Sequence, residues 1–288
     1  MDAVAPPCAG HRTVAVVENV RVARDTYRLR LDDPVMAGAI RPGQFLMIRP
    51  AAGDGTDPLL GRPFALYDVV RDAAGMPRAL DVVYLVIGRG TAALAGRRPG
   101  DRVAVWGPLG NGFGPPPPGE VIFVAGGIGQ TPFLALGRWW LGRVEYGGVA
   151  EAPTGPFASS ARLLYGVRTA DLAAGLDDFQ RAGVEVELAT DDGSAGHHGY
   201  VTDLLARRLE AGSAPARVVG CGPPAMLAAL ARLVDRHGVT CDLSLENHMA
   251  CGIGVCFSCV VPIRQADGST DLRRICVEGP IFASTDVA

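Results

Sequence analysis

Short apolar runs separated by turn residues dominate the first third of the chain. These runs are rich in β-branched and aromatic residues, and hardly any segment shows the spacing of an amphipathic helix. The pattern predicts strands at 13–17, 27–31, 45–48, 80–87 and 102–106. Strands at this spacing are typical of an antiparallel barrel.

The pattern changes after the stiff run of four prolines at 115–118 and Gly119, which indicates a domain junction. Beyond it, short apolar strands alternate with helical periodicity, and this alternation predicts a parallel, doubly wound sheet. The predicted strands are 120–125, 162–165, 184–189 and 217–220, and the predicted helices are 131–143, 172–182, 200–210 and 224–237. A segment at 147–160 that is rich in Gly, Ala, Pro and Ser is interpreted as a loop insertion.

The last fifty or so residues hold a group of cysteines between predicted strands near 241–245 and 260–263. The whole pattern therefore predicts a β plus α/β architecture in three parts. These are an antiparallel β-barrel at 11–114, a parallel-sheet α/β domain at 119–238 and a small cysteine module at 239–288.

Composition excludes several classes of protein. The chain has 288 residues, 48% hydrophobic and 20% charged, which is enough apolar material for substantial cores. The net charge of −3 and scattered basic residues do not indicate a nucleic-acid-binding surface. The first ten residues lack a signal-peptide pattern, and no apolar run has the length of a membrane span. We therefore expect a cytoplasmic protein without a membrane span.

Cys251, Cys256, Cys259 and Cys276 have the spacing C-x4-C-x2-C-x16-C, which is the plant-type ligand spacing for a [2Fe–2S] cluster. Gly252 and Gly254 free the backbone of this loop to point amide groups inward. Cys276 is expected to arrive from a separate strand. Structural zinc is an alternative, but it usually takes two short cysteine knuckles. Disulfides are another, but the seven cysteines are an odd number.

Two glycine turns follow predicted strands of the α/β domain. The first contains Gly126, Gly127 and Gly129, with Thr131 and Pro132 as the expected N-cap and first residue of a helix, and it suits a pyrophosphate. The second contains Cys221, Gly222 and Pro223. Both turns are expected at the carboxyl edge of the sheet, where such folds bind ligands. Tight turns also need glycine for packing alone, and a cysteine such as Cys221 is ordinarily a small buried hydrophobe.

The barrel carries weaker signals. Arg62 could clamp a phosphate, and Phe64 or Tyr67 could stack on a flat ring. The turn at 88–91 suits the approach of a phosphate. Each of these features also occurs in barrels without a ligand, since an Arg-Pro turn that leads into a strand is common.

In combination these motifs resemble the ferredoxin–NADP reductase superfamily. Within it, the chain is similar to the electron-transfer subunits of class 1B, NAD-dependent dihydroorotate dehydrogenases. The resemblance extends from about residue 13 to 280 and is most specific at 62–66, 90–91, 107–113, 126–131, 221–226 and 246–259. It implies FAD in the barrel, NADH at the α/β domain and a [2Fe–2S] cluster on the four cysteines.

The resemblance also assigns residues to these cofactors. It implies two flavin-binding stretches and a pyrophosphate contact, while the turn at the carboxyl edge of the sheet suggests Cys221 as a neighbour of the nicotinamide. The flavin and pyrophosphate residues are Arg62, Pro63, Phe64, Ala65, Val83, Tyr84, Leu85, Gly90 and Thr91. Family members commonly have Ser where this chain has Ala65, so one flavin hydrogen bond would be missing unless a backbone amide supplies it.

The implied function is electron transfer in pyrimidine (UMP) biosynthesis. NADH would reduce FAD by two electrons, and the cluster would pass them singly to FMN in a separate dihydroorotate dehydrogenase catalytic subunit. The resemblance implies a heterotetramer with two copies of each subunit, with the residues around Cys251 to Cys259 near the partner. No catalytic residue for orotate chemistry is expected in this chain.

Two alternatives stay open at this point. A related subunit could serve an NAD(P)H:ferredoxin oxidoreductase, a sulfide dehydrogenase or a hydrogenase. A protein of another class would be a zinc-stabilised nucleotide-binding module. For the nucleotide, Arg168 would favour the phosphate of NADP and Asp191 or Asp192 would repel it, and the resemblance favours NAD.

Overall fold

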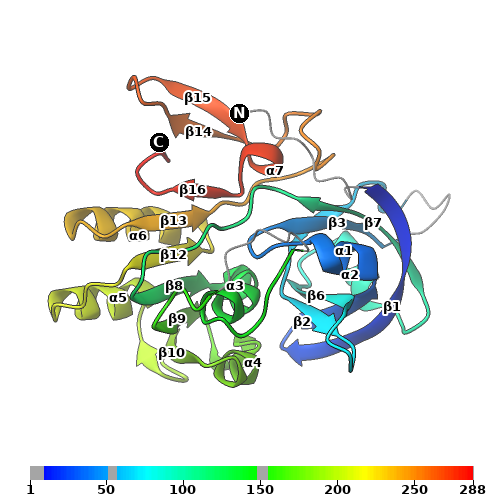
Figure 1. The fold of residues 1–288 in the computed structure, drawn as a ribbon, viewed down its shortest axis with the longest axis horizontal. Helices are drawn as coiled ribbons and strands as arrows, with labels where there is room; N and C mark the ends of the chain where they lie inside the picture. Colours follow the sequence, from blue (N-terminus) through cyan, green and yellow to red (C-terminus); the bar gives the residue numbers. More distant parts are fainter. Residues whose placement is uncertain (1–9, 51–56, 148–154, 288) are drawn as a thin grey trace.

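The computed structural model describes residues 10–50, 57–147 and 155–287 (Figure 1). Residues 148–154 of the predicted loop insertion at 147–160 lie outside the described residues, as does Cys8. Two seven-stranded sheets and a separate two-stranded hairpin make up the described fold. The expected β plus α/β architecture is confirmed, whereas the exact domain boundaries remain a prediction.

The first sheet is antiparallel and has the strand order β4-β3-β7-β1-β2-β6-β5. Its strands are β1 (Gly10–Ala23), β2 (Thr26–Asp32), β3 (Phe45–Arg49), β4 (Arg62–Ala65), β5 (Asp68–Arg71), β6 (Pro77–Leu85) and β7 (Arg102–Leu109). The sheet curls so that β4 packs against β6, around a core that includes Leu29, Leu46 and Val105. Two short helices that the sequence pattern did not predict, α1 (Pro34–Ala39) and α2 (Arg89–Ala95), belong to this part.

The second sheet has the order β11-β10-β9-β8-β12-β13-β16, and all neighbours are parallel except the pair β13 and β16. Its strands are β8 (Glu120–Gly126), β9 (Ser160–Val167), β10 (Val184–Thr190), β11 (His197–His198), β12 (Arg217–Cys221), β13 (Cys241–Ser244) and β16 (Ile281–Ala283). The strand order reverses between β8 and β12. Ligands bind at such a switch point in open α/β sheets.

Helices cover this sheet. They are η1 (Gly127–Gln130), α3 (Phe133–Trp140), η2 (Ala170–Leu172), α4 (Leu176–Arg181), α5 (Val201–Glu210) and α6 (Pro224–Arg236). The expectation that Thr131 caps the first helix is wrong. The chain turns into η1 directly after β8, so Thr131 already has αR backbone angles and Pro132 occupies the N-cap position of α3. The predicted helix 172–182 is also shorter, since α4 begins at Leu176.

The C-terminal segment links the two sheets. Its strands β13 and β16 complete the edge of the second sheet, while the hairpin β14 (Val260–Arg264) and β15 (Thr270–Arg274) stands beyond that edge (Figure 1). A short helix, α7 (Ile275–Glu278), follows the hairpin. One apolar core joins Met47 and Leu109 of the barrel to Leu243 and Cys276. No helix in the described part of the chain is long and apolar enough to cross a membrane.

Candidate functional site

The cysteine loop has the backbone that its glycines were expected to allow. Gly252 and Gly254 have φ angles of +73° and +83°, a region that favours glycine. Amide groups point at sulfur, since Ile253 N–H donates to Cys251 Sγ at 3.4 Å and the Gly254 amide donates to the Cys276 thiol. This loop therefore presents N–H groups to its own thiols, as a metal–sulfur centre requires.

The four thiols lie in two pairs. Cys256 interacts with Cys251, and Cys276 interacts with Cys259 and more weakly with Cys251. Among the described residues, no three His, Cys, Asp or Glu side chains converge as they would around one metal ion. A tetrahedral zinc site brings all four ligands to one point. The preference for a [2Fe–2S] cluster therefore rests on the spacing of the four cysteines.

The surroundings of the thiols differ. Hydrogen bonds from the Ser258 side chain and backbone, followed by contacts with Cys251, lower the pKa of Cys256 to about 6. Desolvation, with smaller contributions from Cys259, raises the pKa of Cys276 to about 12. Thiolate is the form that binds metal, so Cys256 is prepared for ligation near neutral pH. Cys276 lies on the short helix α7, and the expectation that it comes from a strand is wrong.

Arg274 is a residue of this region that the sequence motifs did not reveal. Its guanidinium donates to Gly254 O at 3.2 Å and to Glu278 Oε2 at 3.2 Å, and it lies 5.0 Å from the centre of the Phe257 ring. It therefore connects the loop of three cysteines to the helix of the fourth. Phe257 is a non-glycine residue with a positive φ of 55°, so this contact supports a strained backbone.

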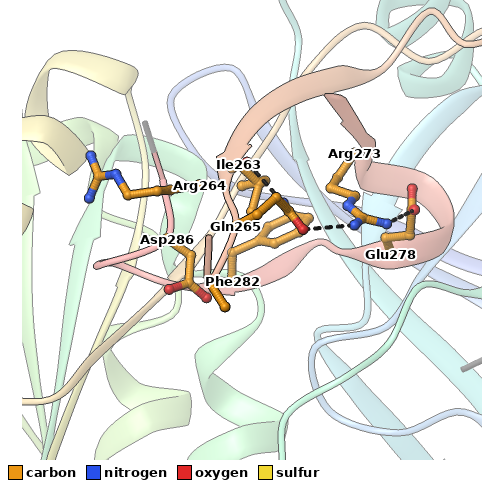
Figure 2. Close-up of a pocket in the computed structure, with 8 residues that line it drawn as sticks. Ile263, Arg264, Gln265, Arg273, Glu278, Phe282 and Asp286 are labelled. Atoms are coloured by element: carbon orange, nitrogen blue, oxygen red, sulfur yellow. Dashed lines mark hydrogen bonds and ion pairs between the residues drawn. The ribbon is translucent and has the colours of Figure 1, made fainter. Parts of the chain in front are cut away.

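The neighbouring Arg273 turns to the other side of the hairpin. Figure 2 shows it between Gln265 and Glu278, which accept its hydrogen bonds at 3.0 and 3.2 Å. These residues line a cavity of about 500 Å³ together with Ile263, Arg264, Ala266, Phe282 and Asp286. Its cationic groups are engaged by protein acceptors, since Arg264 also donates to Thr285 O at 2.9 Å.

A larger groove of about 1490 Å³ lies between the two sheets. The barrel contributes Asp25, Thr26 and 85–87, and the α/β part contributes both glycine turns. Of the predicted cofactor-binding residues, the groove is lined by Leu85 of the second flavin stretch and by Gly126, Gly127, Gly129, Gly222 and Pro223 of the glycine turns. Arg168 and Asp191 both line it as well, so the cationic and the anionic candidate for the nucleotide lie in the same groove.

The two glycine turns pack against each other at the switch point. A Cβ on Gly129 would lie 2.3 Å from Cys221 O, and one on Gly126 would lie 2.7 Å from Pro223 Cδ. Packing alone therefore explains these two glycines. Gly127 differs, because its φ is +56° and no atom lies within 4 Å of the corresponding Cβ position. This residue leaves the backbone accessible from the groove.

Cys221 is buried behind the groove, beside Ser244 and Glu246. Burial raises the pKa of Cys221 well above its usual value, and the Glu246 carboxylate adds to this effect. Glu246 lines the groove, and part of this residue is exposed to solvent. The protein around its carboxyl group nevertheless excludes water, and this desolvation raises the pKa of Glu246. Thr131 is buried and does not line the groove.

The predicted phosphate residues of the barrel lie together, outside the residues that line the large groove. The side chain of Arg62 reaches to within 3.6 Å of the Cβ position of Gly90, at the beginning of α2. The Arg62 guanidinium is exposed and donates to Leu60 O and Gly61 O. Thr91 Oγ1 accepts hydrogen bonds from the amides of Ile87 and Gly88 and so shapes the turn. A cation beside a helix N-terminus is a suitable environment for a phosphate.

The side chains of Phe64 and Tyr67 are buried in the described structure. Phe64 packs edge-on against Tyr84 in the barrel core, and the Tyr84 hydroxyl donates to Asn19. Tyr67 is 2% exposed, and its hydroxyl donates to Asp178 Oδ2 at 2.8 Å. Neither ring is exposed in this arrangement, and the stacking of Phe64 or Tyr67 on a flat ring stays a prediction. Val83 is also buried, and Pro63 and Ala65 are half-buried on β4, so these positions can meet a flavin chiefly through their backbone.

Comparisons with known proteins agree with this arrangement. The family model described as the iron-sulfur cluster binding domain of dihydroorotate dehydrogenase B matches residues 246–288. The electron transfer subunit of dihydroorotate dehydrogenase B (NAD(+)) from Desulforamulus reducens is 35% identical over 267 residues, which cover 92% of this chain and 94% of the relative. The protein of the same name from Geobacillus kaustophilus is 35% identical, with 96% and 98% covered.

Solved structures show the same fold. A structure described as the NADH-dependent reduced ferredoxin-NADP oxidoreductase, studied for flavin-based electron bifurcation, has a TM-score of 0.77 and 26% identity and covers 96% of this chain and 89% of its own. Amycolatopsis cytochrome P450 reductase GcoB has a TM-score of 0.59 at 24% identity, with 80% and 67% covered. Because these relatives are 35% identical and cover nearly the whole chain, the chain belongs to the family of dihydroorotate dehydrogenase B (NAD(+)) electron transfer subunits.

Proposed function

We propose that this chain carries electrons from NADH to the FMN of a dihydroorotate dehydrogenase catalytic subunit, in pyrimidine biosynthesis. The observation that carries the proposal is the position of the cysteine loop. It packs on β3 and β7 of the barrel through Met47 and Leu109, while the same C-terminal segment contributes Glu246 to the nucleotide groove. One chain thus brings a thiol centre, a barrel and a nucleotide groove together.

The residues present fit the three groups. Cys251, Cys256, Cys259 and Cys276 would hold a [2Fe–2S] cluster. Arg62 and the amides at Gly90 would hold the FAD phosphates, and the groove around Gly127 would hold NADH. When bound, FAD takes two electrons from NADH and releases them singly, which the one-electron cluster requires. The chain's own contribution is binding and orientation.

The partner surface is proposed at the exposed tip of the cysteine loop. Ile253, Val255 and Phe257 are 57%, 74% and 60% exposed, and this apolar patch lies within five consecutive residues of the cysteine loop. Exposed apolar groups that cluster in this way mark interaction sites. We propose that the catalytic subunit covers this patch, in a heterotetramer with two copies of each chain in the cytoplasm.

The experiment combines the purified chain with an FMN-containing dihydroorotate dehydrogenase catalytic subunit and measures orotate reduction driven by NADH. Activity that appears only in the mixture supports the proposal. Val255→Asp should abolish this activity and leave the iron content unchanged. Met76→Asp is the matched control, because Met76 is 62% exposed on the turn between β5 and β6.

A second candidate keeps the chemistry and changes the acceptor. The ferredoxin-NADP oxidoreductase structure named above matches 96% of this chain, which favours a ferredoxin-linked partner as the alternative. Reduction of ferredoxin by the chain and NADH, without orotate reduction in the mixture, would favour that candidate and contradict the first.

A further inference from the structure

Strand β7 and the turn that follows it contact both halves of the thiol set. Trp106 lies on β7, and Asn111 lies in the turn just beyond the end of this strand. Each side chain reaches across to the C-terminal segment, by way of hydrogen bonds that join positions 145 to 170 residues apart. Neither residue was identified from the sequence as a ligand-binding position.

Trp106 connects the loop of three cysteines to the barrel. Its indole Nε1–H donates to Cys251 O at 2.9 Å. The far edge of the same ring covers Gly61, where a Cβ would lie only 2.4 Å from Trp106 Cη2. Gly61 precedes Arg62, so a single side chain contacts a cluster ligand and the beginning of the predicted flavin stretch. On the neighbouring strand, Met47 pairs with both Trp106 and Pro63.

Asn111 holds the segment that follows the fourth cysteine. Its Nδ2 donates to Glu278 O at 3.2 Å and to Ile281 O at 2.9 Å, and its Oδ1 accepts from Ile281 N–H at 3.2 Å. The Asn111 backbone N–H also donates to Gly279 O. These contacts satisfy main-chain groups on both sides of Pro280 and fix the end of α7, which carries Cys276.

We propose that Trp106 and Asn111 are positioning residues that hold the two halves of the thiol centre at a fixed place on the barrel. The inference rests on the proposed function, because a fixed place matters when electrons pass between groups held by the barrel and by the thiols. Trp106 sets the position of the loop 251–259, and Asn111 sets the position of Cys276. Both act through neighbouring backbone and touch no substrate.

The test uses the cofactor-loaded chain and three variants. Trp106→Phe keeps an aromatic ring but removes the indole donor, and Asn111→Ala removes the amide. Trp139→Phe is the matched control, since Trp139 is a half-buried tryptophan on α3 that packs against Phe157, away from the cysteines. Amide hydrogen exchange, iron release to a chelator and the ratio of cluster reduction to flavin reduction after mixing with NADH are measured.

Loss of a hydrogen bond of ordinary strength is expected to speed local opening roughly 2- to 10-fold. Trp106→Phe should therefore raise exchange at 250–255, and Asn111→Ala should raise it at 278–281. Both should speed iron release and slow cluster reduction more than flavin reduction.

Exchange and iron release equal to those of Trp139→Phe in both variants would overturn the inference. A wild-type chain that binds no flavin or cluster would instead overturn the proposed function, so the two failures are distinguishable. If Trp106→Phe does not fold, Asn111→Ala alone tests the inference, by the same measurements of hydrogen exchange, iron release and cluster reduction.

Discussion

Trp106 Nε1–H donates a hydrogen bond to Cys251 O at 2.9 Å, although 145 residues separate the two positions. This contact ties the cysteine loop to a central strand of the barrel. Around it, Met47 and Leu109 crowd the Cβ position of Gly252 at 2.6 and 3.2 Å. The cysteine loop is therefore supported by the barrel, and substitutions in the barrel should alter the position of the thiols.

The packing of Gly61 against Trp106 provides the first prediction. A Cβ at Gly61 would lie 2.4 Å from Trp106 Cη2, so Gly61→Ala should force the indole away and destabilise the chain by about 1–3 kcal/mol. Urea unfolding measures this loss, and iron content measures the effect on the cysteine loop.

Two further variants separate this clash from a general effect of glycine replacement. Gly38 lies in helix α1 with no atom within 4 Å of its Cβ position, so Gly38→Ala should stabilise by about 0.5–1 kcal/mol. Adding Trp106→Phe to Gly61→Ala should recover part of the lost stability, because the smaller ring leaves room. A Gly61→Ala chain as stable as wild type would contradict the account.

Arg274 provides the second prediction. Arg274→Gln should speed iron loss, because the guanidinium ties Gly254 and Phe257 to α7. It should also lower the reduction potential of the cluster, since a nearby positive charge favours the more negative, reduced form. A redox titration followed by electron paramagnetic resonance measures this shift.

Arg273→Gln is the control for that measurement. Arg273 is adjacent in sequence but donates to Gln265 and Glu278 in the smaller cavity (Figure 2). Its replacement should leave the potential near that of wild type. Equal potentials in the two variants would refute a specific role for Arg274.

Features that depend on local sequence could be predicted well. The glycine turns and the cysteine loop are recognised from short sequence motifs. The positive φ angles of Gly252 and Gly254 follow from the same local pattern. The alternation of strand and helix likewise indicated the parallel sheet. These elements need no knowledge of distant contacts.

Features that depend on distant contacts could not be predicted. The orientations of Phe64 and Tyr67 depend on Tyr84 and Asp178, which lie 20 and 111 positions further along the chain. The aromatic character of these residues suggested ring stacking, whereas core packing decided where they point. The hydrogen bond between Trp106 and Cys251 has no local signature either, because the sequence around a tryptophan on a strand does not indicate its distant partner.

Gln130 provides the third prediction. Its side chain is fully buried, and within the described part of the chain neither amide atom has a hydrogen-bond partner. An unsatisfied buried amide is costly, so Gln130→Met should raise the free energy of unfolding by about 1 kcal/mol. Thermal or urea unfolding tests this. A loss of stability would contradict this prediction.

Glu246 provides the fourth prediction, which concerns pH. Desolvation raises the pKa of its carboxyl above the ordinary value of 4.5. A raised pKa in the folded state means that stability is full below the unfolded pKa and falls as pH rises through the folded pKa. Glu246→Gln should remove this loss. The free energy of unfolding of the variant minus that of wild type should therefore increase as pH rises from about 4.5. A difference that is constant with pH would contradict the assignment.

The central claim is that one chain passes electrons from NADH through a flavin to a thiol-bound cluster. The most direct test is an anaerobic titration of the purified chain with NADH, followed by visible absorbance and electron paramagnetic resonance. The account predicts that NADH bleaches the flavin bands and produces the signal of a reduced [2Fe–2S] centre. A colourless protein that contains zinc, or a flavin that is reduced while a cluster reducible by dithionite stays oxidised, would contradict it.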